Sequence, residues 1–145
     1  MTKNITYSLM LFLAISIFTF SGCKKKDDKN NSSSYSNADY AGTWTVTDGC
    51  CSGSFQITIT ATGSNGVSIT NYRKCTAASG WNLTGTVSGN KLTIPTQNVV
   101  SGTQGGPYQF SGTGTLNSTS SLTIPYVMAD GSGGFPQNCT ATCTK

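Results

Sequence analysis

The chain contains no histidine and few charged residues: 10% of its 145 residues are charged. Histidine is the usual general base and metal ligand near neutral pH, so its absence removes the commonest route to both. From Asp39 onward the carboxylates are Asp39, Asp48 and Asp130. Asp48 and Asp130 lie beside glycine, where aspartate is ordinary turn material. A glycosidase would need two facing carboxylates. We therefore expect a protein that is not an enzyme and that needs no cofactor.

Common motifs for hydrolysis and for nucleotide binding are also missing. The sequence has no Gly-x-Ser-x-Gly, which marks the nucleophile of many hydrolases, and it has no phosphate-binding loop and no dinucleotide fingerprint. From Asp39 onward four basic residues (Arg73, Lys74, Lys91 and Lys145) stand against three acids, for a net charge of +1. Most of the overall charge of +4 precedes that point. This part of the chain offers no basic surface for nucleic acid, and we expect no such partner.

A charged start and an apolar run open the chain. Lys3 precedes a mostly apolar stretch of sixteen residues, 5–20. This stretch is short for a membrane-spanning helix, which needs about 20 residues. A short basic start, an apolar middle and small residues at its end are typical of a secretory signal peptide. We assign residues 1–22 to such a signal.

The four residues Phe20, Ser21, Gly22 and Cys23 resemble the lipobox of bacterial lipoproteins, with phenylalanine where leucine is commoner. The resemblance implies that Cys23 becomes the first mature residue, carries diacylglycerol on its sulfur and an acyl chain on its amine, and anchors the protein in a membrane. Several acyl chains anchor stably where one alone is marginal. The alternative is a secreted protein with a coincidental cysteine.

Residues 23–38 are polar and low in complexity, which predicts a lipidated, flexible tether. Lys24 follows the cysteine where aspartate would signal retention in the inner membrane. Lys26, Asp27 and Asp28 resemble the export signal of surface lipoproteins in the Bacteroidota; the alternative is a solvated charge run. The resemblance implies an outer-membrane protein, anchored through Cys23 and with a possible cell-surface location.

Strict alternation of side chains begins after the tether. Phe55 and Ile57 alternate with Gln56 and Thr58, for example. A period of two indicates half-buried strands, and we find no helical period after the leader. Short connections favour an antiparallel meander, and eight strands can close into a barrel. The domain, 39–145, is therefore expected to be all-β, with strands at 42–48, 54–61, 66–72, 81–88, 91–95, 107–117, 121–129 and 138–144.

Prolines and glycines modify this pattern. The sequence LTIP at 92–95 recurs at 122–125. Proline cannot donate to a strand ladder, so Pro95 and Pro125 should mark a strand end, an edge or a bulge, and the barrel should be flattened or incompletely closed. Inward-facing Gly85, Gly112 and Gly114 either allow sharp bending or leave room for a bound molecule.

Three stretches resemble a known family: 40–48 (YAGTWTVTD), 83–95 (LTGTVSGNKLTIP) and 110–116 (FSGTGTL). The first is similar to the opening Gly-x-Trp strand of lipocalin-like domains. The other two are similar to small β-sheet lipoproteins of the Bacteroidota. The resemblance implies a lipocalin-like barrel over about 40–145, shorter than a full lipocalin and with no helix packed on it. Members of that group mostly lack a defined activity.

Six cysteines in a small exported chain indicate an oxidising compartment. Cys50 and Cys51 are adjacent, so their side chains should point apart and find different partners. If the first strand lies beside the last, Cys139 is near one of them and Cys75 near the other. Cys143 is then left over, facing inward as a small apolar residue. A metal site is the weaker alternative, because histidine is absent and Cys139 and Cys143 are far apart on one strand.

Four aromatic residues, Tyr72, Trp81, Tyr108 and Phe135, lie at expected strand ends or in loops. They could stack on a sugar or an apolar ligand at the barrel mouth, or they could be core residues of the rim. The first hypothesis is thus a lipid-anchored module that binds a small apolar or sugar ligand. The second is a structural or adhesion lipoprotein that contacts proteins through its threonine-rich outer face. A filled barrel interior would count against an internal ligand site.

Overall fold

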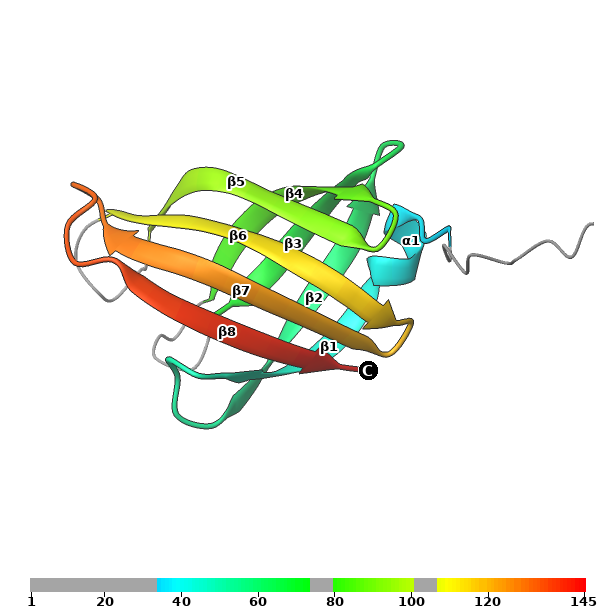
Figure 1. Ribbon diagram of the computed structural model, residues 1–145, viewed down its shortest axis with the longest axis horizontal. Helices are drawn as coiled ribbons and strands as arrows, with labels where there is room; N and C mark the ends of the chain where they lie inside the picture. Colours follow the sequence, from blue (N-terminus) through cyan, green and yellow to red (C-terminus); the bar gives the residue numbers. More distant parts are fainter. Residues whose placement is uncertain (1–33, 74–79, 101–106) are drawn as a thin grey trace, which may run out of the picture. The chain divides into compact units, whose positions relative to one another are not determined.

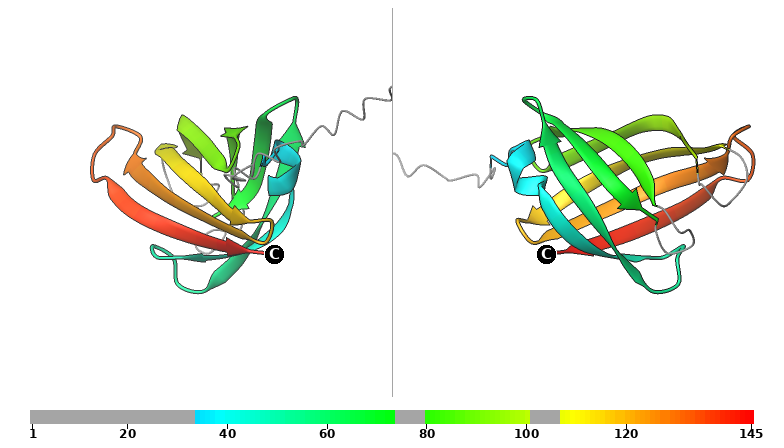
Figure 2. Two further views of the ribbon diagram at one scale, coloured as in Figure 1. Left: turned by 45° about the vertical axis from the view of Figure 1, so that its right-hand side comes forward. Right: turned by 180° about the vertical axis from the view of Figure 1, so that it is seen from behind.

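A computed structural model describes residues 34–73, 80–100 and 107–145. Eight antiparallel strands form a closed barrel in chain order, with β1 beside β8 (Figures 1 and 2). The all-β meander predicted from side-chain alternation is confirmed. The elements are α1 (Asn37–Tyr40), β1 (Gly42–Asp48), β2 (Ser54–Thr62), β3 (Gly66–Tyr72), β4 (Trp81–Ser88), β5 (Lys91–Val100), β6 (Pro107–Ser118), β7 (Ser121–Asp130) and β8 (Gln137–Thr144).

The barrel closes between its first and last strands. Four residue pairs join β1 to β8, from Thr45–Thr144 to Asp48–Ala141. The backbone N–H of Gly49 then donates to the carbonyl of Thr140 at 3.0 Å, which extends the ladder past the end of β1. The expectation of an incompletely closed barrel is therefore wrong. Every described strand pairing and the whole described hydrophobic core lie within the compact unit Asn31–Lys145, which is the property that defines a domain.

The two prolines are accommodated in different ways. Pro95 lies where the β5–β6 register shifts, between Ile94 and Gln97, so the predicted bulge is confirmed. Beyond it β5 continues to Val100, whereas the sequence suggested an end at Pro95. Pro125 instead lies within β7, paired with Thr140 of β8 and with no register shift beside it, so the expectation of a strand end, an edge or a bulge at Pro125 is wrong. A bulge preserves the strand while giving proline a place without a ladder hydrogen bond.

The interior is packed with side chains. Glycine contributes to this packing rather than to an empty space: a Cβ on Gly85 would lie 2.9 Å from both Cδ1 of Leu92 and the carbonyl oxygen of Thr93. A Cβ on Gly114 would lie 3.1 Å from Cβ of Leu92. The space at these glycines is thus occupied by neighbouring strands. Six large inward-facing residues from five strands are all buried: Trp44, Phe55, Ile57, Leu83, Phe110 and Ile124. An interior that is filled in this way counts against an internal ligand site.

A helix of four residues, α1, lies at one end of the barrel (Figure 1). Asp39 accepts hydrogen bonds from the backbone N–H and the hydroxyl of Ser36, which fixes the first turn. The buried Asn37 donates to the carbonyls of Gly63 and Gly66 at 3.2 and 3.0 Å. The sequence predicted no helix and assigned residues 34–38 to the tether. Here Asn37 is instead bonded to the β2–β3 turn, and Tyr35 packs on the core.

The opposite end of the barrel, where β1, β3 and β7 finish and β4 and β6 begin, is called the mouth below. Figure 1 shows the β7–β8 connection there, away from α1. Among the described residues, no helix is both long and apolar enough to span a bilayer.

Candidate functional site at the barrel mouth

Aromatic rings from four strands meet just inside the mouth. Trp81 at the start of β4 lies against Tyr108 of β6, with ring centroids 5.7 Å apart and planes inclined by 31°. Phe110 contacts Trp81 edge-on at 6.2 Å and stacks on Tyr126 at 4.8 Å. Tyr72 of β3 meets Phe110 edge-on at 5.1 Å. Such pairs stabilise a core beyond their buried area, so the mouth is a rigid aromatic layer.

The four aromatic residues predicted to contact a ligand differ in exposure and in position. Tyr72 is 0% exposed and belongs to the core, so it is out of reach of a ligand at the rim. Trp81 is 7% exposed, and Tyr108 is half-buried beside it. Phe135 stands apart in the β7–β8 connection and is 90% exposed. Of these four residues, Tyr108 alone combines contact with another of the rings and partial exposure, and the largely buried Trp81 packs against it.

Arg73 also belongs to the mouth, although the sequence indicated it only as one of four basic residues. Arg73 follows β3 in a left-handed conformation, with φ of 54°, and is 7% exposed. Its guanidinium lies over the Trp81 ring, 5.5 Å from the centroid, in a cation–π arrangement. Nη2 donates to the Cys50 carbonyl at 3.2 Å, and Nη1 lies against the sulfur of Met128. Within the described chain, the buried Nε has no hydrogen-bond partner.

A buried carboxylate, that of Asp48, binds the backbone N–H of the same residue, Cys50, whose carbonyl Arg73 binds. Asp48 is 3% exposed. Its Oδ1 accepts from the backbone N–H of Cys50 at 2.8 Å, and its Oδ2 accepts from the Tyr126 hydroxyl at 2.7 Å. Because Arg73 binds the carbonyl of the same residue, Cys50 links the two opposite charges. A buried charge is costly unless it is hydrogen-bonded, and each of these two side chains is hydrogen-bonded to the backbone of Cys50.

The local environment sets the protonation of the buried groups. Burial raises the pKa of Tyr126, and its hydrogen bond to Asp48 raises it further. Burial also raises the pKa of Tyr72 far above its ordinary value. The same cause raises the pKa of the Cys143 thiol to about 12. All three groups are therefore neutral at physiological pH, and the thiol has little nucleophilic character.

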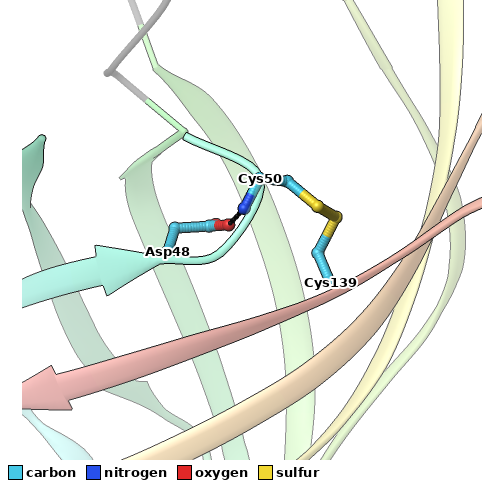
Figure 3. A group of neighbouring side chains, drawn as sticks. All are labelled: Asp48, Cys50 and Cys139. Carbon is cyan, nitrogen blue, oxygen red and sulfur yellow. Dashed lines mark hydrogen bonds between the residues drawn. A yellow bond between two sulfur atoms is a disulfide. The ribbon is translucent and has the colours of Figure 1, made fainter. Parts of the chain in front are cut away.

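A disulfide joins Cys50, just past β1, to Cys139 on β8, with the Cα atoms 5.7 Å apart (Figure 3). This is one of the two pairings expected for Cys139. Cys51 is also disulfide-bonded, and Cys75, its expected partner, lies outside the described residues, as does Cys23. Cys143 is free and buried on the inward face of β8, as expected. The Cys50–Cys139 bond reinforces the seam at which the barrel closes.

The disulfide also determines whether Asp48, Cys50 and Cys139 can bind a metal ion. The three ligand atoms lie within 4.8 Å of one another. Metals bind the thiolate form of cysteine. Both sulfurs are bonded to each other here (Figure 3), so the trio is not a thiolate donor set in this oxidised state. Instead, the disulfide and the Asp48 hydrogen bond together hold Cys50, and with it the β1–β2 connection, against β8.

The fold and the mouth define a small, closed, eight-stranded antiparallel barrel with a filled interior. Comparison of the chain with protein-family models, with curated proteins and with solved structures found no match.

Proposed function

We propose that the protein is a lipid-anchored lipoprotein of the bacterial outer membrane, and that the rim of its barrel binds a small apolar or sugar ligand. The lipobox-like residues 20–23 support the anchor, with Cys23 as the acylated residue. The described chain begins beside α1, at the end of the barrel opposite the mouth (Figure 1). A tether that leaves from that end allows the mouth to face away from the anchoring membrane.

The observation that carries the ligand proposal is the contact of Trp81 with Tyr108 beneath the Arg73 guanidinium. An aromatic face accepts the apolar side of a sugar ring or a short aliphatic chain. Arg73 packs on the inner side of this pair and holds the Trp81 ring in place; its Nε is buried, so it is not a donor to a ligand at the rim. The interior is filled, so the ligand is expected at the rim rather than inside the barrel. Phe135, which is exposed on the neighbouring β7–β8 connection, provides a further apolar contact for such a ligand.

Indole NMR signals test the rim site directly, because the chain has only two tryptophans, Trp44 and Trp81. Methyl glycosides and medium-chain fatty acids would be added to the leaderless protein, residues 24–145. Binding at the rim shifts the Trp81 indole signal and leaves that of the fully buried Trp44 in place. Tyr108→Ala should abolish the shift, whereas Tyr35→Ala, at the α1 end, should not. If both indole signals stay fixed with every compound, the rim is not a ligand site.

The anchor has its own test. Cells expressing the full chain would be labelled with radioactive palmitate, and the wild type would be compared with Cys23→Ala. Loss of label in the variant supports lipidation at Cys23. Equal labelling of both proteins would refute it.

A second candidate function, protein adhesion, is favoured by the geometry of the β7–β8 connection. Oδ1 of Asp130 accepts hydrogen bonds from the backbone N–H groups of Ser132 and Gly134, at 3.0 and 2.7 Å, and from the Ser132 hydroxyl. This ordered turn holds Phe135 in a left-handed conformation, with φ of 51° and its ring in solvent. A pre-ordered, exposed aromatic residue is the usual form of an interface anchor.

Adhesion is tested by cross-linking intact cells and comparing the wild type with Phe135→Ser. A protein recovered repeatedly with the wild type and lost with the variant supports a protein partner at this loop. The absence of a consistent partner from the outer membrane would count against adhesion.

A further inference from the structure

A groove of about 610 Å³ runs over the outer surface of β5, β6, β7 and β8, separate from the rim. Its volume falls within the range typical of small-molecule sites, about 300–1,000 Å³. Outward-facing, exposed side chains from all four strands line it. Those used below are Thr93, Pro95, Thr113, Pro125, Val127 and Thr140.

The fold creates the groove by bending the wall inward. β5 changes register at Pro95, on one side of the groove. In the middle, a Cβ on Gly112 would lie 3.0 Å from the carbonyl oxygen of Pro125 and 3.0 Å from Cβ of Tyr126. Strands β6 and β7 thus approach closely where Gly112 has no side chain. Glycine and a bulge are the usual means of turning a barrel wall.

A transverse row of side chains crosses the groove. Thr93 is paired with Thr113 across β5 and β6, and Pro125 is paired with Thr140 across β7 and β8. Gly112 is paired with Tyr126, so Thr113 and Pro125 lie opposite each other on the outer face. Neighbouring strands are about 4.8 Å apart, so hydroxyl groups and apolar surfaces recur at that spacing.

The chemistry of the lining is neutral and hydroxyl-rich. No residue that lines the groove carries a charge. The hydroxyls of Thr93, Thr113 and Thr140 make no hydrogen bond within the described structure. Elsewhere on the outer face the hydroxyls of Thr70 and Thr115 are engaged with the protein. The groove therefore offers free donors and acceptors beside the apolar surfaces of the two prolines and Val127.

We propose that this groove binds an uncharged glycan, laid across strands β5 to β8. A sugar chain presents hydroxyls at its edges and C–H groups on its faces, which matches alternating threonine hydroxyls and proline or valine surfaces. A charged glycan would lose its hydration here without gaining a counter-ion. The site is independent of the rim, of Cys23 and of the Phe135 loop.

The test is an amide NMR titration of the ¹⁵N-labelled leaderless protein with maltohexaose, cellohexaose and mannohexaose, each in a separate experiment. Binding of at least one of them should shift the amide signals of residues 93, 94, 96, 111–113, 126–127 and 138–140. Thr113→Lys should weaken that binding by about tenfold or more, because the ammonium group would have to lose water in the groove. Thr60→Lys, an equally exposed substitution on β2, is the matched control and should bind normally.

Val127→Glu provides a second variant of opposite charge, which should also weaken binding. The proposal is overturned if none of the three glycans shifts the groove amides. It is also overturned if the shifts centre on Trp81 and Tyr108, a result that would instead support the rim site. Tighter binding of polygalacturonate than of the neutral chains would likewise refute a neutral groove.

Discussion

The side-chain amide of Gln97 takes the place of a backbone peptide beside Thr84. Its Oε1 accepts from the Thr84 backbone N–H at 3.1 Å, and its Nε2 donates to the Thr84 carbonyl at 3.0 Å. Regular pairing of β4 with β5 covers only three residue pairs and stops at Thr86–Thr93. The bulge at Pro95 then carries β5 away from β4, and Gln97 spans the wider gap. This one side chain continues the barrel wall where the ladder ends.

We therefore expect Gln97→Ala to lower the free energy of unfolding by about 1–2 kcal/mol, the net value of its exposed hydrogen bonds to Thr84 and to the Pro95 carbonyl. Gln97→Glu should also destabilise, because a carboxylate cannot donate to the Thr84 carbonyl. Asn98→Ala, on the same strand, is the control, since the Asn98 side chain makes no hydrogen bond within the described structure. Urea unfolding measures all three. Equal stability of the Ala variants at positions 97 and 98 would show that the bridge contributes nothing.

Local sequence pattern was sufficient to predict the strands but not the features that depend on register. Alternation such as Phe55, Ile57 and Ile59 marks a strand whatever its neighbours are, so all eight strands were found. Pro95 indicated a possible bulge, but the Gln97 bridge also depends on which residue of β4 lies opposite, and local alternation does not reveal that register. Four residues are too few to show a helical period, so α1 was missed, although Ser36 followed by Asp39 resembles a helix start.

The candidate site was predictable to a smaller extent. Trp81 and Tyr108 were found because aromatic residues at strand ends of a barrel gather at its mouth. Arg73 was missed because its burial depends on Trp81 and Cys50, which are distant in sequence. Topology placed Cys139 near Cys50 or Cys51, since closure puts the end of β1 beside the start of β8, but it did not decide between the two cysteines. Tyr72 was assigned to the rim, but the rings of Phe110 and Tyr126 enclose it.

The Cys50–Cys139 disulfide closes a loop with a sequence separation of 89 residues. Removing it with the double change Cys50→Ser and Cys139→Ser should lower the free energy of unfolding by about 2–5 kcal/mol, because the unfolded chain gains entropy. Urea unfolding under non-reducing conditions measures the loss. Cys143→Ala is the control for a lost sulfur, and should cost only about 1 kcal/mol for a small cavity. A double variant no less stable than this control would contradict the prediction.

Tyr126 and Tyr72 form a matched pair, because both are buried and only one has a hydrogen-bond partner for its hydroxyl. Tyr126 donates to Asp48 at 2.7 Å, whereas the Tyr72 hydroxyl has no partner within the described residues. Tyr126→Phe removes a donor from a buried carboxylate and should destabilise by about 1–3 kcal/mol. Tyr72→Phe removes a buried, unsatisfied hydroxyl and should be neutral or stabilising by about 1 kcal/mol.

Thermal and urea unfolding of the two phenylalanine variants would be compared side by side. The assignment of the two hydroxyls is supported if Tyr126→Phe lowers the free energy of unfolding while Tyr72→Phe raises it or leaves it unchanged. If Tyr72→Phe destabilises as much as Tyr126→Phe, then the Tyr72 hydroxyl has a partner, such as an internal water.

Alkaline pH should destabilise the barrel through its buried neutral acids. Burial raises the pKa of Cys143 from 9.0 to about 12, and that of Tyr72 well above 10.0. Above the unfolded pKa values the unfolded chain loses these protons while the native chain keeps them. The native state then binds more protons, so its stability falls as the pH rises. The contribution is complete below pH 9 and declines between about pH 9 and 12.

Urea midpoints measured in steps from pH 7 to pH 11 should therefore be level at first and then fall. Cys143→Ala removes the thiol that titrates first on unfolding, so its decline should begin about one pH unit later, near the ordinary tyrosine pKa of about 10. Tyr72→Phe should reduce the slope above that point. Lys91→Gln, a substitution at an exposed position, should change neither the pH at which the decline begins nor its slope. Stability that stays constant up to pH 11 in the wild type would show that these groups titrate alike in the folded and unfolded chain.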